Sequence, residues 1–417
     1  MMGLGSIVGT GVFVSIGIAA GVAGPAVLVA VAVGALVATC NGLSSAQLAA
    51  SHPVSGGTYE YGYRFLTPTL GFAAGWMFLV AKSASAATAA LGFAGYLLLS
   101  VGADGGRWLV PVAVGAVAAI TAVVYAGLRR SNAANVAVVS LTIAALAAFV
   151  AAGTPTALAN AAESFAGVLD GPDGPDGGVR SLLYASALMF VAYTGYGRIA
   201  TLGEEVREPR TTIPRAIVTT LWATAALYGV VAAVAVAAVG ADGLAAATAE
   251  RAAPLEVAAR AFGVPGVPEV VAAGAITAML GVLLNLVLGL SRVLLAMGRR
   301  ADVPRVFARV DAAGTTPGPA VLMMGGVVAA IALVGDVRAT WSFSAFAVLA
   351  YYAVTNLAAL SLPPEGRLYP RWVSVAGLVA CAGLAFFVEP QTWGLGLGVL
   401  AAGLVWHAVA RRLRAPA

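Results

Sequence analysis

Long apolar stretches joined by short polar loops make up almost the whole chain. Roughly 20 apolar residues are needed to cross the hydrocarbon core of a bilayer, and about twelve stretches approach or exceed that length. The pattern therefore predicts an all-α integral membrane protein with about twelve transmembrane helices. The predicted spans are residues 1–22, 25–49, 70–101, 108–127, 133–153, 181–202, 214–239, 269–298, 319–335, 340–361, 372–388 and 392–410.

The composition excludes a soluble enzyme. Of the 417 residues, 60% are hydrophobic and 10% are charged, whereas about 25% of the residues of soluble domains are charged. Cys40 and Cys381 lie inside apolar stretches and indicate no disulfide framework, and His52 and His407 are too far apart to suggest a metal site. We therefore expect no metal and no cofactor, and the sequence carries no hydrolase or metalloprotease motif.

In the predicted topology most arginines lie on one side of the membrane. Short basic loops stay in the cytoplasm, so we expect a multi-pass protein of the cytoplasmic membrane with both termini cytoplasmic. With that orientation 17 arginines lie inside and five lie outside, namely Arg107, Arg180, Arg251, Arg260 and Arg338. The net charge of +5 does not indicate a nucleic acid partner, because the basic residues are divided between the two sides of the membrane in this way.

Two glycine-rich segments interrupt the apolar pattern inside spans. The first is Gly5–Phe13 in the first span, and the second is Phe190–Gly197 in the sixth. Irregular backbone at membrane depth is tolerated only where protein or a watery cavity satisfies it, so both segments predict an unwound helix. The pair sits at matching positions of two five-helix halves, which is the pattern of an inverted-repeat transporter with a site near the midplane. The alternative is that these glycines are only close-packing positions.

Unwinding would create binding groups for a zwitterion. Free N–H groups at the amino end of a half-helix favour an anion such as a carboxylate. Free carbonyl groups at the other half-helix ends suit an ammonium group. The segment around Gly9–Gly11 would supply N–H groups of this kind.

In these segments the chain resembles the amino acid–polyamine–organocation (APC) superfamily of permeases. The first glycine run resembles the first-helix signature of that superfamily, and four more stretches agree with it in order and spacing. These are Gln47–Tyr61, Gly203–Arg215, Ser291–Arg299 and Tyr352–Asn356.

The resemblance implies a fold. It is a LeuT-like 5+5 inverted repeat with helices 1 and 6 broken, in a single transporter domain over residues 1–417. The first five-helix repeat would cover 1–153. The second would cover about 181–335, or would extend to helix 10 at 361, and residues 372–410 would form two additional helices.

The resemblance also implies the residues that hold a substrate. Backbone N–H groups of the first break, at Thr10 and Gly11, would hold the α-carboxylate, with the Thr10 hydroxyl as an extra donor and Gly9 as part of the same binding segment. The α-amino group would be held by carbonyls before the first break and in the sixth-helix break. Those carbonyls belong to Ile7, Val191, Ala192 and Thr194.

An aromatic residue of the sixth span closes over the ligand in the family. Tyr193 is our preferred lid, with Phe190 and Tyr196 as gate candidates. The alternative for all three is ordinary aromatic packing between helices.

The acidic residues indicate a neutral substrate. None of the 18 lies deep in a predicted span, and a cationic side chain or polyamine would need a buried counter-charge. Many relatives have a glutamate just after the sixth-helix break, where this chain has Gly197. Gln47 replaces an acidic residue of their first cytoplasmic loop.

For ion coupling we predict a different residue from the helix 5 lysine that relatives often use. Relatives often carry a lysine in helix 5, and Thr142 lies near that position here. Lys82, the single lysine of the chain, lies instead inside the third span, with Ala86, Ala89 and Ala90 at helical spacing. We predict that Lys82 is the titrating or charge-compensating group, because burial lowers a lysine pKa readily. The alternative is snorkelling of its side chain toward the interface.

The sequence thus predicts a secondary active transporter of a neutral amino acid, working by alternating access and not an enzyme. Its partners would be the amino acid, a co-transported proton or sodium ion, and the lipid bilayer, with proton coupling favoured. An amino acid exchanger, a carrier of a small amine, and a membrane receptor or sensor are the alternatives. Eight residues precede Gly9, fewer than in relatives, so we expect either an upstream start or a shortened inner gate.

Overall fold

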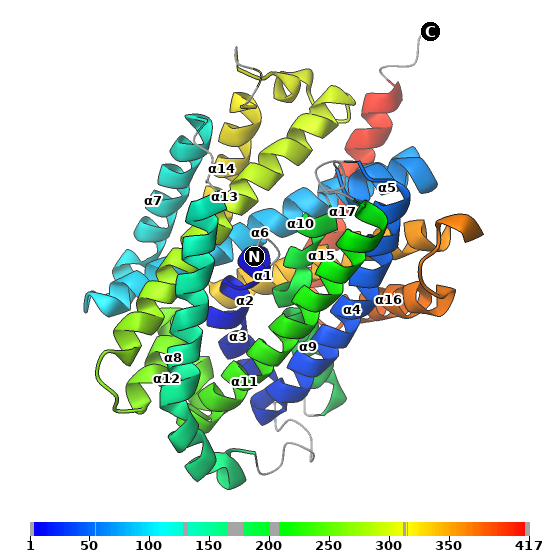
Figure 1. Ribbon diagram of the computed structural model, residues 1–417. Coiled ribbons are helices and arrows are strands. Elements are labelled where there is room, and N and C mark those ends of the chain that lie inside the picture. The colour runs from blue at the N-terminus through cyan, green and yellow to red at the C-terminus, as the bar shows by residue number, and fades with distance from the viewer. Residues whose placement is uncertain are drawn as a thin grey trace.

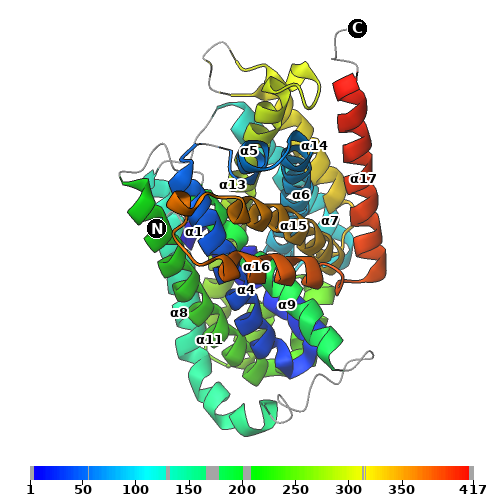
Figure 2. The same ribbon diagram turned by 90° about the vertical axis from the view of Figure 1, so that its right-hand side faces the viewer.

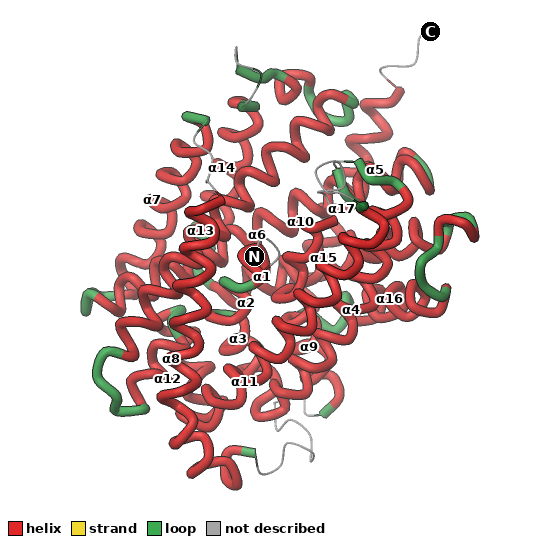
Figure 3. Tube along the Cα trace, in the orientation of Figure 1, coloured by secondary structure: helices red, strands yellow, loops and turns green. Residues whose placement is uncertain are grey.

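The computed structural model describes residues 4–54, 56–127, 132–165, 178–200, 208–311, 314 and 316–412. Within these residues the chain is helical and has no strand (Figure 3). Residues 203–207 of the predicted motif before helix 7 lie outside the described part of the chain.

The helices follow the predicted spans closely. The first half contains α1 (Leu4–Ile7), α2 (Thr10–Phe13), α3 (Ser15–Ala23), η1 (Gly24–Ala26), α4 (Val27–Ser51), α5 (Thr58–Phe65), α6 (Pro68–Ser100), α7 (Gly105–Tyr125) and α8 (Asn132–Ser164). The second half contains α9 (Val179–Tyr193), η2 (Thr194–Tyr196), α10 (Gly197–Ala200), α11 (Pro209–Arg251), α12 (Pro254–Ala261), α13 (Val267–Arg299), η3 (Arg305–Ala308), α14 (Gly318–Ala332) and α15 (Val337–Leu360). The remaining elements are η4 (Pro364–Gly366), α16 (Arg371–Leu384) and α17 (Pro390–Arg412).

The described helices make this a multi-pass membrane protein. Eight of them are long and apolar enough to cross a bilayer, and α14 and α16 are shorter apolar helices. One of the eight, Thr10–Ser51, turns at Gly24 with a positive φ of 58° and so covers two of the predicted spans. A total of twelve crossings stays a prediction.

The structure differs from the prediction mainly between spans. α8 continues to Ser164 and α11 continues to Arg251, past a kink at Gly240 (φ 72°, ψ 168°). The alanine-rich sequence after Gly240 has high helix propensity, whereas our prediction ended the span where polar residues begin. α5 and α12, of eight residues each, are amphipathic helices that are too short to appear in a search for apolar spans.

α6 lies at the centre of the bundle and α17 at its rim. α6 packs against α7, α13 and α15, and most of its residues are buried. α1 to α3 lie in the middle of the bundle, enclosed by α8, α11, α13 and α9 (Figure 1). α17 runs along one edge (Figure 2) and buries little beyond Gly396, Gly403 and His407. The centre of the bundle therefore holds both glycine-rich segments.

Candidate functional site

The first glycine run interrupts the first helix. α1 ends at Ile7, and α2 begins at Thr10 after Gly9 takes an extended conformation with φ 178°. A second interruption at Val14 separates α2 from α3. The N–H groups of Thr10 and Gly11 stand in the first turn of α2, where no intrahelical carbonyl can reach them. The backbone therefore offers N–H groups at the position predicted for a carboxylate.

The sixth helix is interrupted at the second glycine-rich segment. α9 ends at Tyr193, a single 3-10 turn follows over Thr194–Tyr196, and α10 resumes at Gly197. The Thr194 hydroxyl donates to the Val191 carbonyl at 2.8 Å, and the Tyr352 hydroxyl donates to the Thr194 carbonyl at 3.4 Å. Both carbonyls also accept a main-chain hydrogen bond, from the Thr194 N–H and the Gly197 N–H respectively, so the side chains add second donors at the break.

The two interruptions touch each other. A Cβ atom on Gly11 would lie 2.8 Å from the Ala192 Cβ atom and 2.8 Å from the Tyr228 hydroxyl, so a glycine is required for this approach. The Tyr228 hydroxyl in α11 donates to the Ile7 carbonyl at 2.8 Å and lies 3.4 Å from the Ala192 carbonyl. Two carbonyls predicted to hold an ammonium group therefore converge on one hydroxyl donor.

Sequence reasoning missed Tyr228. The residue is fully buried in the seventh predicted span and is the one tyrosine of that span. A buried tyrosine hydroxyl usually finds a partner, so a tyrosine in a mostly apolar span was the available signal. Its partner could not be named before the two breaks were placed together.

Thr10 adds an unsatisfied polar group to the site. Its side chain is buried, and its hydroxyl oxygen makes no hydrogen bond in the part of the chain that the structure describes. Buried hydroxyls without partners are uncommon in folded proteins. The Thr10 hydroxyl is therefore an available donor beside the N–H groups of the first break.

Lys82 reaches the sixth-helix break. Its ammonium group donates to the Thr194 hydroxyl at 2.9 Å, and 9% of the residue is exposed. Ala86, Ala89 and Ala90 are fully buried, so α6 is closely packed along this face. The side chain thus points into the bundle at Thr194 and does not snorkel, and no acidic residue among the described ones pairs with it.

Thr142 is not joined to this contact. It is 2% exposed, and its hydroxyl donates to the Val138 carbonyl within α8 at 2.7 Å. Gly9, unlike Gly11, lies against α13, where an added Cβ atom would lie 2.5 Å from the Val282 side chain. The structure therefore brings together the two breaks and Lys82, and it leaves Thr142 bonded within its own helix.

The three aromatic candidates are fully buried and lie in two groups. The Tyr193 hydroxyl donates to the Val31 carbonyl at 3.2 Å, and its ring lies 5.2 Å from the Tyr228 ring. Phe190 and Tyr196 flank Tyr352 of α15, with ring centroids 5.5 and 5.7 Å away. Tyr193 thus covers the Tyr228 side of the breaks, and the other two cover the α15 side.

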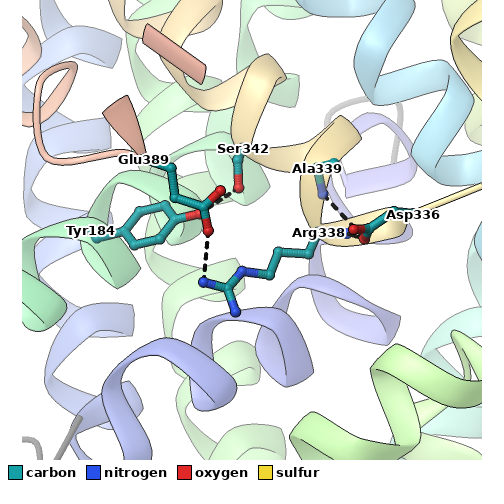
Figure 4. Close-up of polar contacts among 6 residues, drawn as sticks. All are labelled: Tyr184, Asp336, Arg338, Ala339, Ser342 and Glu389. Atoms are coloured by element: carbon teal, nitrogen blue, oxygen red, sulfur yellow. Dashed lines mark hydrogen bonds and ion pairs between the residues drawn. The ribbon is translucent and has the colours of Figure 1, made fainter. Parts of the chain in front are cut away.

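Polar contacts tie α9 to α15 at one end of the bundle. The Tyr184 and Ser342 hydroxyls lie 2.6 Å apart, and Arg338 forms an ion pair with Glu389 at 2.7 Å (Figure 4). The Asp336 carboxylate caps α15 by accepting from the Arg338 N–H group at 2.7 Å. These contacts join the start of α15 to α9 and to the residue that precedes α17.

A second cluster lies at the opposite end, which is rich in arginine. The Asp302 carboxylate accepts from the Tyr59 and Tyr63 hydroxyls at 2.6 Å each, and its other oxygen lies 3.6 Å from the His407 Nδ1 atom. The Trp406 indole donates to the Asp302 carbonyl at 2.9 Å. Burial, and then the Asp302 carboxylate, raise the pKa of both tyrosines, so both hydroxyls stay neutral donors. The cluster joins α5 and α17 to the end of α13.

Comparison with known proteins identifies the family. The amino acid permease family description matches residues 1–408. This chain belongs to the amino acid permease family. Three of the stretches that carried the resemblance are Gln47–Tyr61, Ser291–Arg299 and Tyr352–Asn356. They form the α4–α5 segment, the end of α13 and the second half of α15, respectively.

Relatives of this permease are named transporters. An uncharacterized transporter of Mycobacterium tuberculosis is 42% identical over 411 residues, which is 99% of this chain and 89% of the relative. A branched-chain amino acid permease of Bacillus subtilis is 26% identical over 97% of this chain and 88% of its own length. A methylthioribose transporter of Bacillus subtilis is 28% identical over 80% of this chain and 72% of its own length. The APC resemblance read from the sequence is therefore confirmed.

Proposed function

We propose that this permease moves a neutral amino acid across the cytoplasmic membrane by alternating access, in symport with a proton. The observation that carries the proposal is the contact between the two interrupted helices at Gly11 and Ala192, with Tyr228 bonded across it. Only broken helices at membrane depth present main-chain groups of both polarities to one ligand.

The substrate would bind by exchanging hydrogen bonds. Its carboxylate would accept from the N–H groups of Thr10 and Gly11 and from the Thr10 hydroxyl. Its ammonium group would displace the Tyr228 hydroxyl from the Ile7 carbonyl, where that hydroxyl already occupies the position of a donor. No carboxylate among the described residues lies beside the breaks, so a neutral side chain is the class that the site favours.

Lys82 would carry the coupling proton. Its ammonium group donates to Thr194 inside the sixth-helix break, so its charge acts directly on the element that binds substrate. Loss of the proton would remove a buried charge and weaken that contact. The inverted-repeat architecture, and the placement of both termini in the cytoplasm, belong to the same proposal.

The names of the relatives indicate which substrates should be tested. One named relative acts on branched-chain amino acids and another on methylthioribose. A carrier of a small solute that lacks an amino acid carboxylate, such as a small amine, is therefore the second candidate, because one relative is named a methylthioribose transporter. An amino acid exchanger is the alternative to symport.

Counterflow in proteoliposomes tests the proposal. We expect labelled leucine, isoleucine or valine to exchange against unlabelled neutral amino acids, with uptake increased by an inward proton gradient and unaffected by sodium. Gly11→Val should abolish uptake, because its side chain would collide with Ala192 and Tyr228. Gly229→Val, at a position with open space around it, is the matched control and should retain uptake.

Two outcomes would contradict the proposal. Uptake of methylthioribose with no uptake of any amino acid would replace the substrate class. Full activity in Gly11→Val protein that is correctly inserted would show that the contact between the breaks is not the binding site.

A further inference from the structure

An apolar groove opens on the outer surface of the bundle near its arginine-rich end. It has a volume of about 460 Å³ and lies between α6, α13, α14 and α17. Met323 and Trp406 line it and are 45% and 44% exposed, so the groove is open to its surroundings. Trp76, Ser83, Val303 and Phe307 line its inner wall.

The groove occupies the half of the membrane next to the arginines. α6 begins at Pro68, so Trp76 lies about 12 Å and Ser83 about 22 Å along the helix at 1.5 Å per residue. The C-terminal end of α17 lies at the same end of the bundle as the loop between α13 and α14 (Figure 2). At this depth the groove faces lipid acyl chains.

The polar end of the groove carries exposed positive charge. Arg305 directly follows Pro304, which lines the groove, and Arg309 comes two residues after Phe307. Arg411 and Arg412 end α17 beyond the groove residue Trp406. All four arginines are exposed, and none forms an ion pair within the described residues.

Two carboxylates lie near these arginines in sequence, and one of them, Asp311, accepts from the Thr316 N–H group at 2.9 Å. The other, Asp302, does not neutralise the charge. Asp302 is 3% exposed and is engaged by Tyr59, Tyr63 and His407. The groove therefore combines an apolar channel at acyl depth with a cationic rim at headgroup depth. That combination is complementary to a lipid with a negatively charged head.

We propose that the groove is a binding site for an anionic glycerophospholipid. One acyl chain lies along the wall from Trp76 to Ser83, and the phosphate lies among Arg305, Arg309 and the end of α17. Basic pockets between transmembrane helices bind anionic headgroups, with each arginine near the surface adding to the attraction. A zwitterionic lipid makes the same chain contacts but gains less at the rim.

The site also connects to the contacts of α17. Trp406 lines the groove and donates to the Asp302 carbonyl at 2.9 Å. α17 is otherwise little buried. A lipid in the groove would therefore hold α17 against the segment that follows α13.

Lipid binding to the purified full-length protein tests the proposal. Native mass spectrometry and thermal unfolding would be followed during titration with dioleoylphosphatidylglycerol or dioleoylphosphatidylcholine. We expect at least tenfold tighter binding of the phosphatidylglycerol. The double variant Arg305→Gln, Arg309→Gln should lose about tenfold of that preference, while Arg371→Gln, at an exposed arginine of α16, should not.

A groove-filling variant separates the chain contact from the charge. Ala402 lines the groove and is exposed, so Ala402→Trp should occupy the acyl channel and weaken both lipids. Ala401→Trp adds the same bulk at an exposed neighbouring position that does not line the groove, and binding should be unchanged. Equal affinity for the two lipids, a preference for phosphatidylglycerol that survives the double arginine variant, or lipid binding that Ala402→Trp leaves unchanged would overturn the proposal.

Discussion

Single side chains keep the backbone of the two breaks satisfied. The Tyr228 hydroxyl bonds to the Ile7 carbonyl, and the Thr194 hydroxyl bonds to the Val191 carbonyl. An unpaired buried carbonyl costs about 1–3 kcal/mol. The Val191 carbonyl avoids this cost twice, because it also accepts from the Thr194 N–H group. Under the proposed function, a substrate then needs only to replace one donor with a better, charged one.

Lys82 is the residue whose substitution tests the proposed proton coupling. We expect Lys82→Met to abolish the pH dependence of uptake in proteoliposomes, because the ammonium donor to Thr194 is lost. Lys82→Arg should keep the positive charge but not release it, since arginine stays protonated, and it should also transport without pH dependence. Proton-driven accumulation that persists in Lys82→Met would reject the coupling role.

At the scale of elements, short segments outside the apolar spans hold the long helices together. α5 and the end of α13 meet α17 at Asp302, and Arg300 extends this contact by pairing with Glu60 at 2.6 Å and lying over the Tyr63 ring. Breaking a buried network that includes a charge costs about 3–5 kcal/mol. The contact is therefore strong enough to fix α5 relative to the end of α13.

Asp302→Asn tests this contact. Loss of the carboxylate charge weakens two hydrogen bonds and the contact with His407, so we expect a marked fall in the thermal unfolding temperature at pH 7. Asp242→Asn makes the same exchange at an exposed position of α11 and should leave that temperature unchanged. Similar unfolding temperatures for both variants would show that the Asp302 contacts add nothing to stability.

At the scale of the whole molecule, the two ends of the bundle differ in charge. One end carries Arg338 and its partner Glu389, whereas the other carries Arg299, Arg300, Arg305 and Arg309. Short basic loops remain on the cytoplasmic side during insertion. We therefore propose that the arginine-rich end faces the cytoplasm.

Orientation is open to direct measurement. A single cysteine introduced at Arg309 in a Cys40→Ala, Cys381→Ala background should react with an impermeant maleimide in inside-out vesicles. The same reagent should label a cysteine at Arg107 in right-side-out vesicles. Labelling in the opposite pattern would show that both termini lie outside the cell.

The sequence determined the membrane class, the family and most helix bounds, because apolar length alone decides what can cross a bilayer. It also marked both breaks, since glycine clusters inside spans are locally readable. Sequence reasoning ended two helices too early, at 153 and 239, because polar residues are compatible with helix once they lie beyond the membrane. α5 and α12 are amphipathic and eight residues long, so they lack the continuous apolar stretch that marks a membrane span.

Tertiary structure decided which polar groups meet. Tyr228 lies 221 residues from Ile7, and Lys82 lies 112 residues from Thr194, yet each pair is hydrogen-bonded. Periodicity gives the face of a helix but not the partner across it. Long-range packing alone brought the single lysine to the sixth-helix break, and it left Thr142 bonded within its own helix.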